Sequence, residues 1–288
     1  MKKIKLLPFY IIALIPLTVL YFFSDIIYLI VFYLLKYRRK VVLKNLIDSF
    51  PLKTKQELAQ IEKQFYHHLC DMIVESISIL GISEKNIKKR LKITNPEMVE
   101  QYQQEGKSII LYTAHFGNWE WISFFPLYFT NLVTAFYQPL SSKYFDEIFK
   151  TFRTRFGLMC IENNTGYRTL LKLKNENKVS LNIMAGDQSP RGHSTKHWVN
   201  FLNQDTAFLI GAETIAKKSN QVVLYPHYTK TKRGHYEITL QLISDTPTTD
   251  DKYQITEKYT SLLEQNIISS PHIWLWSHKR WKLNKEEH

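Results

Sequence analysis

Apolar and polar residues alternate along this chain in blocks that fit strands and helices in turn. The apolar run 109–112 suits a strand buried in a parallel sheet. Strands are predicted at 109–112, 131–136, 158–161, 179–184, 222–228 and 236–243, and helices at 53–80, 142–156, 166–175, 207–219 and 250–269. Strands that alternate with helices predict the α/β class, with a mostly parallel sheet flanked by helices.

The N-terminal segment is more apolar than the rest of the chain. Residues 6–23 carry no formal charge and would form a helix of about 27 Å, close to the hydrocarbon thickness of a bilayer. Ser24 and Asp25 interrupt this run, and a second apolar run covers 26–35. Either the chain spans once and then follows the interface, or it forms a shallow hairpin. We expect 1–36 to be an uncleaved membrane anchor and 37–288 to be one large domain.

Basic residues outnumber acidic ones, with a net charge of +12. They cluster at 36–44, 53–63 and 279–285. This excess favours an anionic partner such as nucleic acid, a membrane surface or an acidic carrier protein. We expect no nucleic acid, because no zinc-finger, RNP-like or helix-turn-helix signature is present. The stronger basic flank after the apolar segment places the large domain in the cytosol, with 38–46 as a basic amphipathic helix on anionic lipid.

Cysteine and histidine spacing offers no metal or disulfide framework. The two cysteines, Cys70 and Cys160, fit a reducing compartment. His67 and His68 are adjacent on a predicted helix and face different sides of it, so they do not form a metal pair. We therefore expect no metal and no cofactor.

The candidate chemistry centres on His115, just after the 109–112 strand, because ligands collect at the carboxyl ends of strands in open α/β sheets. Asn118 is the predicted N-cap of the helix that follows. On one helix, His115 and Glu120 would point about 140° apart. With His115 in the turn, however, Glu120 can fold back and fix the imidazole tautomer, leaving the other nitrogen to accept a proton. No serine or cysteine adjoins His115, which indicates a general base acting directly on a hydroxyl; the alternative is a structural histidine.

A second acidic position follows the strand at 179–184. Asp187 either orients His115 from across the sheet, holds a basic side chain that binds substrate, or only caps the next turn. Gln188 follows it directly. Arginine suits phosphate through its bidentate fork, so Arg153, Arg155 and Arg191 are candidates for phosphate contacts.

Three blocks of the sequence together resemble one family. The block His115-Phe116-Gly117-Asn118-Trp119-Glu120 resembles the first motif of the late acyltransferases of lipid A biosynthesis, of the lauroyl and myristoyl type. These enzymes belong to the superfamily of glycerolipid and lysophospholipid acyltransferases, whose motif is a histidine, four residues and an acid. The pair Asp187-Gln188 and the block 274–282 follow in the family's order, and 38–51 resembles its N-terminal helix. The chain departs at Phe201-Leu202-Asn203, where relatives tend to have Phe-Phe-Gly, which leaves the acceptor pocket open.

The resemblance implies a membrane-associated O-acyltransferase at the inner (cytoplasmic) membrane, with its catalytic domain facing the cytosol. Its donor would be an acyl carrier protein thioester and its acceptor a hydroxyl of a lipid A precursor. His115 and Glu120 would be catalytic, with amides near Gly117 and Asn118 stabilising the oxyanion. Substrate binding is expected from Asn118, Arg168, Asp187, Gln188 and Arg191. Alternatives are another glycolipid, aminolipid or phospholipid acceptor, coenzyme A as the donor carrier, or a non-enzymatic peripheral membrane-binding protein.

Overall fold

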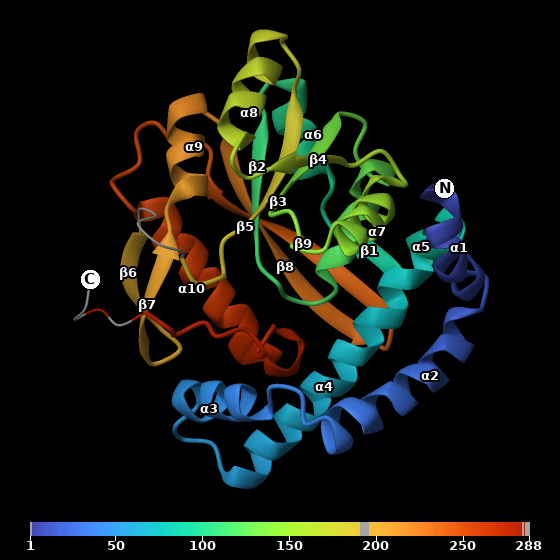
Figure 1. Ribbon diagram of the computed structural model, residues 1–288. Coiled ribbons are helices and arrows are strands. Elements are labelled where there is room, and N and C mark those ends of the chain that lie inside the picture. Colours follow the sequence, from blue (N-terminus) through green and yellow to red (C-terminus); the bar gives the residue numbers. More distant parts are fainter. Residues whose placement is uncertain (1, 191–195, 284, 286–288) are drawn as a thin grey trace.

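A seven-stranded sheet with the order β1-β9-β8-β2-β5-β3-β4 lies at the centre of the computed structural model, which describes residues 2–190, 196–283 and 285 (Figure 1). Neighbouring strands are parallel except β8 and β9, which form an antiparallel hairpin. Strands β6 and β7 form a separate antiparallel pair. The predicted α/β class with a mostly parallel sheet is confirmed.

The strands are β1 (Leu91–Ile93), β2 (Ile109–Thr113), β3 (Leu132–Tyr137), β4 (Met159–Glu162), β5 (Ser180–Ala185), β6 (Lys196–Phe201), β7 (Gln204–Leu209), β8 (Val222–Lys232) and β9 (His235–Ser244). The α-helices are α1 (Lys2–Ala13), α2 (Leu17–Leu29), α3 (Arg39–Ser49), α4 (Lys55–Ser78), α5 (Glu84–Arg90), α6 (Glu97–Gln104), α7 (Lys143–Thr154), α8 (Gly166–Asn175), α9 (Gly211–Ser219) and α10 (Gln254–Ser269). A π-helical turn η1 (Ile30–Leu34) and two 3₁₀ segments, η2 (Trp119–Leu127) and η3 (Pro271–Ile273), complete the described elements.

The connections of β2 and β5 leave these neighbouring strands in opposite directions. From β2 the chain passes through η2 to β3, which lies beyond β5, whereas after β5 it returns to the sheet at β8, beyond β2. Helix α7 packs with η2, and α8 packs with α9, as crossovers on opposite faces require. A switch point therefore lies between the carboxyl ends of β2 and β5, where open α/β sheets bind ligands.

Strand β2 is the most deeply buried part of this sheet. All five of its residues are buried, and Ile109 and Leu111 pair with residues of β5 on one side and β8 on the other. Burial on both faces explains why this strand is continuously apolar rather than alternating. Each fully buried aliphatic side chain stabilises the fold by about 1.5–3 kcal/mol, so β2 is a rigid support for the residues that follow it.

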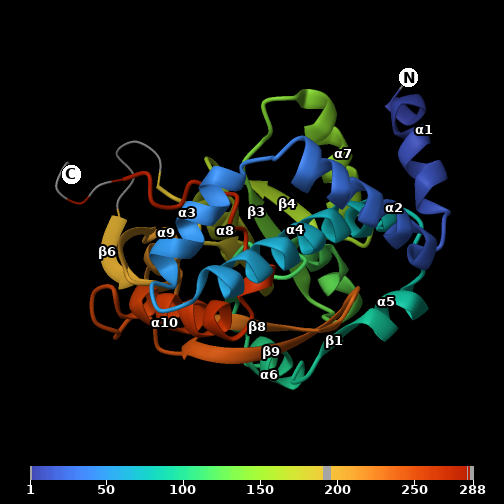
Figure 2. The ribbon, with the colours of Figure 1, turned by 90° about the horizontal axis from the view of Figure 1, so that it is seen from below.

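The N-terminal helices lie along the domain, with α2 beside α4 in both views (Figures 1 and 2). The segment Leu17–Leu34 is long and apolar enough to cross a membrane, and a third of it is buried in the protein. The single helix expected over 6–23 is wrong: α1 ends at Ala13, and after Pro16 helix α2 runs through the polar pair Ser24 and Asp25. They are accommodated because Ser24 Oγ donates to Asp71 (2.8 Å) and Asp25 pairs with Arg233 (2.6 Å).

The predicted helix 207–219 is wrong in its first turn. Residues 207–209 belong to β7, and helix α9 begins at Gly211. Strand β7 pairs with β6 through a two-residue turn in which Leu202 and Asn203 both have positive φ (52° and 62°), the geometry of a type I′ hairpin. By contrast, the limits predicted for α8 agree with the structure.

Candidate active site

His115 lies two residues beyond the end of β2, in a turn that the C-terminal segment holds on its other side. The amide of Gly117 donates to the Ile273 carbonyl (2.9 Å), and the amide of Leu275 donates to the His115 carbonyl (3.1 Å). Gly117 has φ +63°, which favours glycine, and a Cβ there would lie 3.0 Å from the Tyr228 ring, so a larger residue would also have to displace that ring. The 115–120 turn, which carries His115 and Glu120, is thus fixed between β2 and the C-terminal segment.

Asp187, at the carboxyl end of β5, holds the imidazole of His115. Its carboxylate oxygens lie 2.7 Å from His115 Nδ1 and accept the His115 backbone amide at 2.9 Å and Trp274 Nε1 at 3.0 Å. Gln188 Nε2 lies 3.1 Å from His115 Nε2. With Nδ1 donating to Asp187, Nε2 carries the lone pair and accepts from the Gln188 amide. The orientation from across the sheet, one of the alternatives predicted for Asp187, is the arrangement observed.

Charge and burial act in opposite directions on this pair. Burial lowers the pKa of His115, but the charge of Asp187 and the hydrogen bond to it outweigh burial, so the net pKa is raised. Burial likewise opposes ionisation of Asp187, yet His115 and the donated hydrogen bonds lower the pKa of Asp187 to about 2. Asp187 is therefore a carboxylate at neutral pH. The His115 side chain keeps 22% of its surface exposed, so the imidazole remains accessible.

Glu120 is bound to Arg153 of α7 instead of the imidazole. The guanidinium grips both carboxylate oxygens, with Nε to Oε2 at 2.9 Å and a terminal nitrogen to Oε1 at 2.7 Å. Glu120 was expected to fix the tautomer of His115, and the structure assigns that contact to Asp187. The reason is geometric: Asn118 caps η2, and Glu120 enters its first turn facing α7. Its charge still contributes to the raised pKa of His115.

Of the expected oxyanion donors, the Gly117 amide is committed to a structural contact, and so is the side chain of Asn118. The Gly117 amide is taken by Ile273, so Gly117 is not a free oxyanion donor. Asn118 is fully buried; its side chain accepts from the Glu120 amide (3.2 Å) and donates to Glu75 (2.5 Å). This geometry places Asn118 beneath the turn, as a support rather than a surface for substrate.

The candidate arginines are dispersed. Arg168 is exposed at the start of α8, after β4, which is three strands from β2 and therefore about 14 Å across the sheet. Arg155 donates to the Ile79 carbonyl and lies over the Phe156 ring. Arg191 falls outside the described residues. The structure therefore places Asp187 and Gln188 in direct contact with His115. Arg153 contacts Glu120 instead of the imidazole.

The C-terminal block 274–282, singled out above for its family resemblance, is largely buried against the site. Trp274, Trp276 and Arg280 are at most 2% exposed. His278 Nε2 accepts the Ser189 amide (3.1 Å), and burial lowers the pKa of His278 to about 4. Sequence reasoning missed Trp274 as a partner of Asp187; its indole N–H, which needs an acceptor when buried, was the available signal.

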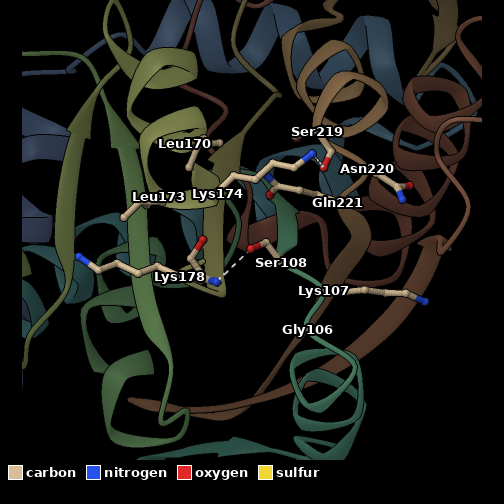
Figure 3. Close-up of a pocket in the computed structure, with 11 residues that line it drawn as sticks. Gly106, Lys107, Ser108, Leu170, Leu173, Lys174, Lys178, Ser219, Asn220 and Gln221 are labelled. Atoms are coloured by element: carbon tan, nitrogen blue, oxygen red, sulfur yellow. Dashed lines mark hydrogen bonds between the residues drawn. The ribbon is translucent and has the colours of Figure 1, made fainter. Parts of the chain in front are cut away.

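A pocket with basic and hydroxyl side chains lies at the opposite end of the sheet (Figure 3). Its lining comes from the amino ends of β2, β5 and β8 and from α8 and α9, and includes Lys107, Ser108, Lys174 and Lys178. His115 and Asp187 lie at the carboxyl ends of these strands, so the pocket is separate from the candidate site. Among the residues that the structure describes, no group of three His, Cys, Asp or Glu side chains could hold a metal ion.

Comparison with known proteins shows the family to which the chain belongs. The family model described as bacterial lipid A biosynthesis acyltransferase matches residues 4–283. A lipid A biosynthesis acyltransferase of Haemophilus influenzae is 24% identical over 236 residues, which cover 81% of this chain and 72% of that protein. The residues that the family model matches include the 115–120 turn, Asp187 and the C-terminal block 274–282. The chain therefore belongs to the bacterial lipid A biosynthesis acyltransferase family.

Proposed function

We propose that His115 is the general base of an O-acyl transfer from an acyl carrier protein thioester to a hydroxyl of a lipid A precursor. The observation that carries this proposal is the Asp187–His115 pair, with a 2.7 Å contact on Nδ1 and an accessible imidazole at the switch point. Family membership supports an acyltransferase acting on lipid A. The carrier protein donor and the base role are our assignments.

The reaction follows from the tautomer. His115 Nε2 accepts the proton of the acceptor hydroxyl while the hydroxyl oxygen attacks the thioester carbonyl. Asp187 stabilises the imidazolium that forms. Collapse of the tetrahedral intermediate breaks the carbon–sulfur bond, and the imidazolium returns the proton to the leaving thiolate. The products are the ester and the free carrier thiol, with no covalent enzyme intermediate.

We assign the oxyanion contact to Gln188. Its side-chain amide already points to His115 Nε2, so an incoming hydroxyl displaces it from the imidazole and frees a donor beside the reacting carbon. The remaining predicted substrate contacts, Arg168 and Arg191, are proposed to bind anionic groups of the substrates away from the reacting atoms.

The proposed location is the inner membrane, with the domain facing the cytosol. Helix α2 packs one side on α4 and leaves large apolar side chains of the other side exposed, among them Phe22, Ile26 and Leu29. Tyr33 and Leu34 of the following η1 are exposed as well. The basic residues that follow, from Lys36 to Lys44, suit anionic headgroups. We propose that residues 1–36 hold the enzyme on the membrane while remaining attached to the domain.

The test of the activity is a mass-resolved transfer reaction with the purified full-length chain. We expect transfer from acyl carrier protein thioesters to a phosphorylated glucosamine lipid, at a hydroxyl of an acyl chain already present. The rate should fall with salt, because an acidic carrier docks on a basic surface. Transfer only from acyl coenzyme A, or only to a glycerol-based lipid, would contradict the donor or the acceptor. No transfer by a folded, membrane-bound sample would favour the non-enzymatic alternative.

A flotation experiment tests the membrane assignment. The full chain should float with anionic vesicles at low salt, and replacing Lys40 and Lys44 by glutamate should weaken this binding without unfolding the protein. Both side chains lie on α3. Equal flotation of the variant and the wild type on neutral and anionic vesicles would contradict the role of these charges.

A further inference from the structure

One face of helix α4 carries a buried polar stripe. His68, Asp71 and Glu75 are spaced three and four residues apart, which places them on one side of the helix, and each is at most 3% exposed. Buried charges are costly unless they are hydrogen-bonded or paired. This stripe therefore needs partners, and its partners connect three separate parts of the chain.

Glu75 is fully buried and accepts three hydrogen bonds. Tyr21 of α2 donates its hydroxyl at 2.8 Å, Tyr236 of β9 donates at 3.0 Å, and the Asn118 amide donates at 2.5 Å. All three partners are donors, and two of them share one carboxylate oxygen. Burial raises the pKa of Glu75, while the charge of Lys230 and the hydrogen bonds donated by Asn118 and Tyr21 oppose this rise. The carboxylate form, which only accepts, satisfies all three donors.

The same helix holds the 115–120 turn at two successive residues. His68 Nε2 lies 3.1 Å from the Gly117 carbonyl, and Glu75 binds the side chain of Asn118. Asn118 in turn accepts the backbone amide of Glu120. The turn is thus supported from below by α4, independently of the contact between Asp187 and His115.

The stripe also fixes α2. Ser24 donates to Asp71 and Tyr21 donates to Glu75, so two residues of α2 on adjacent helical turns bind the stripe that supports the turn. Pulling α2 away from α4 would leave Glu75 with two of its three donors. A change in how α2 is seated is therefore transmitted to Asn118 through a single side chain.

We propose that Glu75 is a positioning residue for acyl transfer: it holds the 115–120 turn through Asn118 and ties that turn to α2 through Tyr21. The inference rests on the proposed role of His115 as the base. Glu75 itself does not contact the reacting atoms. It holds the backbone at 117–120 in place, so that the hydrogen bonds from His115 to Asp187 and from Arg153 to Glu120 are kept.

The first test is Glu75→Gln in the full chain, in detergent. Glutamine offers one acceptor oxygen to three donors, so the turn shifts and the His115–Asp187 contact loosens. We expect kcat to fall about tenfold with KM within about twofold, because small misplacements cost rate rather than binding. The pKa of His115, followed by NMR of the imidazole, should fall, since Asp187 raises it in the wild type.

The matched control is Glu62→Gln. Glu62 is a buried carboxylate on the same helix, 3% exposed, and its partner is Arg39 instead of the turn. A purely structural role for Glu75 would make both variants lose activity only in proportion to their folded fraction, with the His115 pKa unchanged. That result would overturn the proposal.

A swap sharpens the test. In the double variant Glu75→Gln, Asn118→Asp, the donor and the acceptor of the contact exchange places, and residue 118 still accepts the Glu120 amide. We expect kcat to return to within about threefold of wild type. Failure of the swap to restore either kcat or the His115 pKa would remove the direct link between these residues.

The positioning role can still be tested if the Glu75→Gln variant does not fold or if the wild type shows no acyl transfer. If Glu75→Gln does not fold, Asn118→Ala breaks the same contact while leaving both tyrosine donors on Glu75, and an unchanged kcat and His115 pKa in that variant would overturn the proposal. If the wild type transfers no acyl group, the proposed function fails. The NMR titration of His115 still decides the positioning role in that case, because it needs no substrate.

Discussion

The two ends of the central sheet contain the same strands but use charge differently. At the carboxyl end, Asp187 is 3% exposed and receives its donors from His115 and from Trp274, 87 positions away. At the amino end, Lys107 and Lys178 pair with acidic residues two positions away, and these side chains are 37–58% exposed. The first arrangement is non-local and buried, whereas the second is local and in solvent.

This difference distinguishes the candidate active site at the carboxyl end from an ordinary charged surface at the amino end. Exposed pairs between neighbours contribute little, because solvent and salt screen them. Burial of a carboxylate is costly unless several hydrogen-bond donors contact it. At Asp187 these donors come from segments that are distant in the sequence. The amino-end pocket (Figure 3) has basic and hydroxyl side chains but no such convergence. Convergence of distant donors therefore identifies the candidate active site better than the presence of a pocket.

The largest effect is expected from His115→Ala. Removing the base should lower acyl transfer about 10³-fold, since general base catalysis contributes on that order. The fold should persist, because the imidazole is partly exposed and Asp187 keeps the Trp274 and backbone donors. The measurement is kcat for transfer beside a thermal unfolding curve. Near-normal turnover would remove His115 as the base.

Asp187→Asn should lower transfer about 10²-fold through loss of the correct tautomer and of the charge that stabilises the imidazolium. Asp187 raises the pKa of His115, so its removal lowers that pKa. The basic form of His115 then persists at lower pH. The acidic limb of the kcat/KM profile should therefore move to lower pH while the plateau falls; a limb that moves upward would contradict the assignment.

The Glu120–Arg153 pair should show an intermediate effect. Glu120→Ala leaves the largely buried Arg153 without its partner, which should lower the free energy of unfolding by ~3–5 kcal/mol and transfer about tenfold. Because the two residues form one bidentate contact, the double alanine variant should be less destabilised than the sum of the single variants. Denaturant unfolding of the four proteins measures this; strict additivity would show that the pair is not coupled.

The smallest effect is expected at the amino end of the sheet. Lys178→Ala should change transfer by less than about twofold, because this exposed lysine pairs with Glu176 and lies at the opposite end of the strands from His115. The same transfer assay checks it. A tenfold loss would show that the amino-end pocket belongs to the reaction and would overturn the contrast drawn between the two ends.

Local patterns predicted the parts of this molecule that local interactions determine. The apolar run of β2, the Asn118 cap and the limits of α8 all follow from neighbouring residues. The first turn of the predicted helix 207–219 failed because a short apolar run fits strand and helix alike. Residues 207–209 form a strand because they pair with β6.

The site was only partly predictable for a related reason. His115 could be placed at a strand end, but the choice between Glu120 and Asp187 as its partner depends on how β5 and α7 pack. Glu120 is nearer to His115 in sequence, but both of its carboxylate oxygens accept hydrogen bonds from Arg153. The tryptophans of the C-terminal block suit a lipid interface or a buried contact equally, because each has an apolar body and one polar atom. Only the tertiary structure shows that Trp274 lies on Asp187.

The backbone bridge between Phe116 and Trp274 has a consequence for refolding. It closes a loop that contains most of the domain, and contacts of such long range form slowly because the entropy of loop closure must be lost first. Helices such as α4 and α10 rely on local contacts and should form early. After dilution from denaturant, helical circular dichroism should therefore recover before acyl transfer does. The protein should pass through an intermediate that has helical structure but no transfer activity.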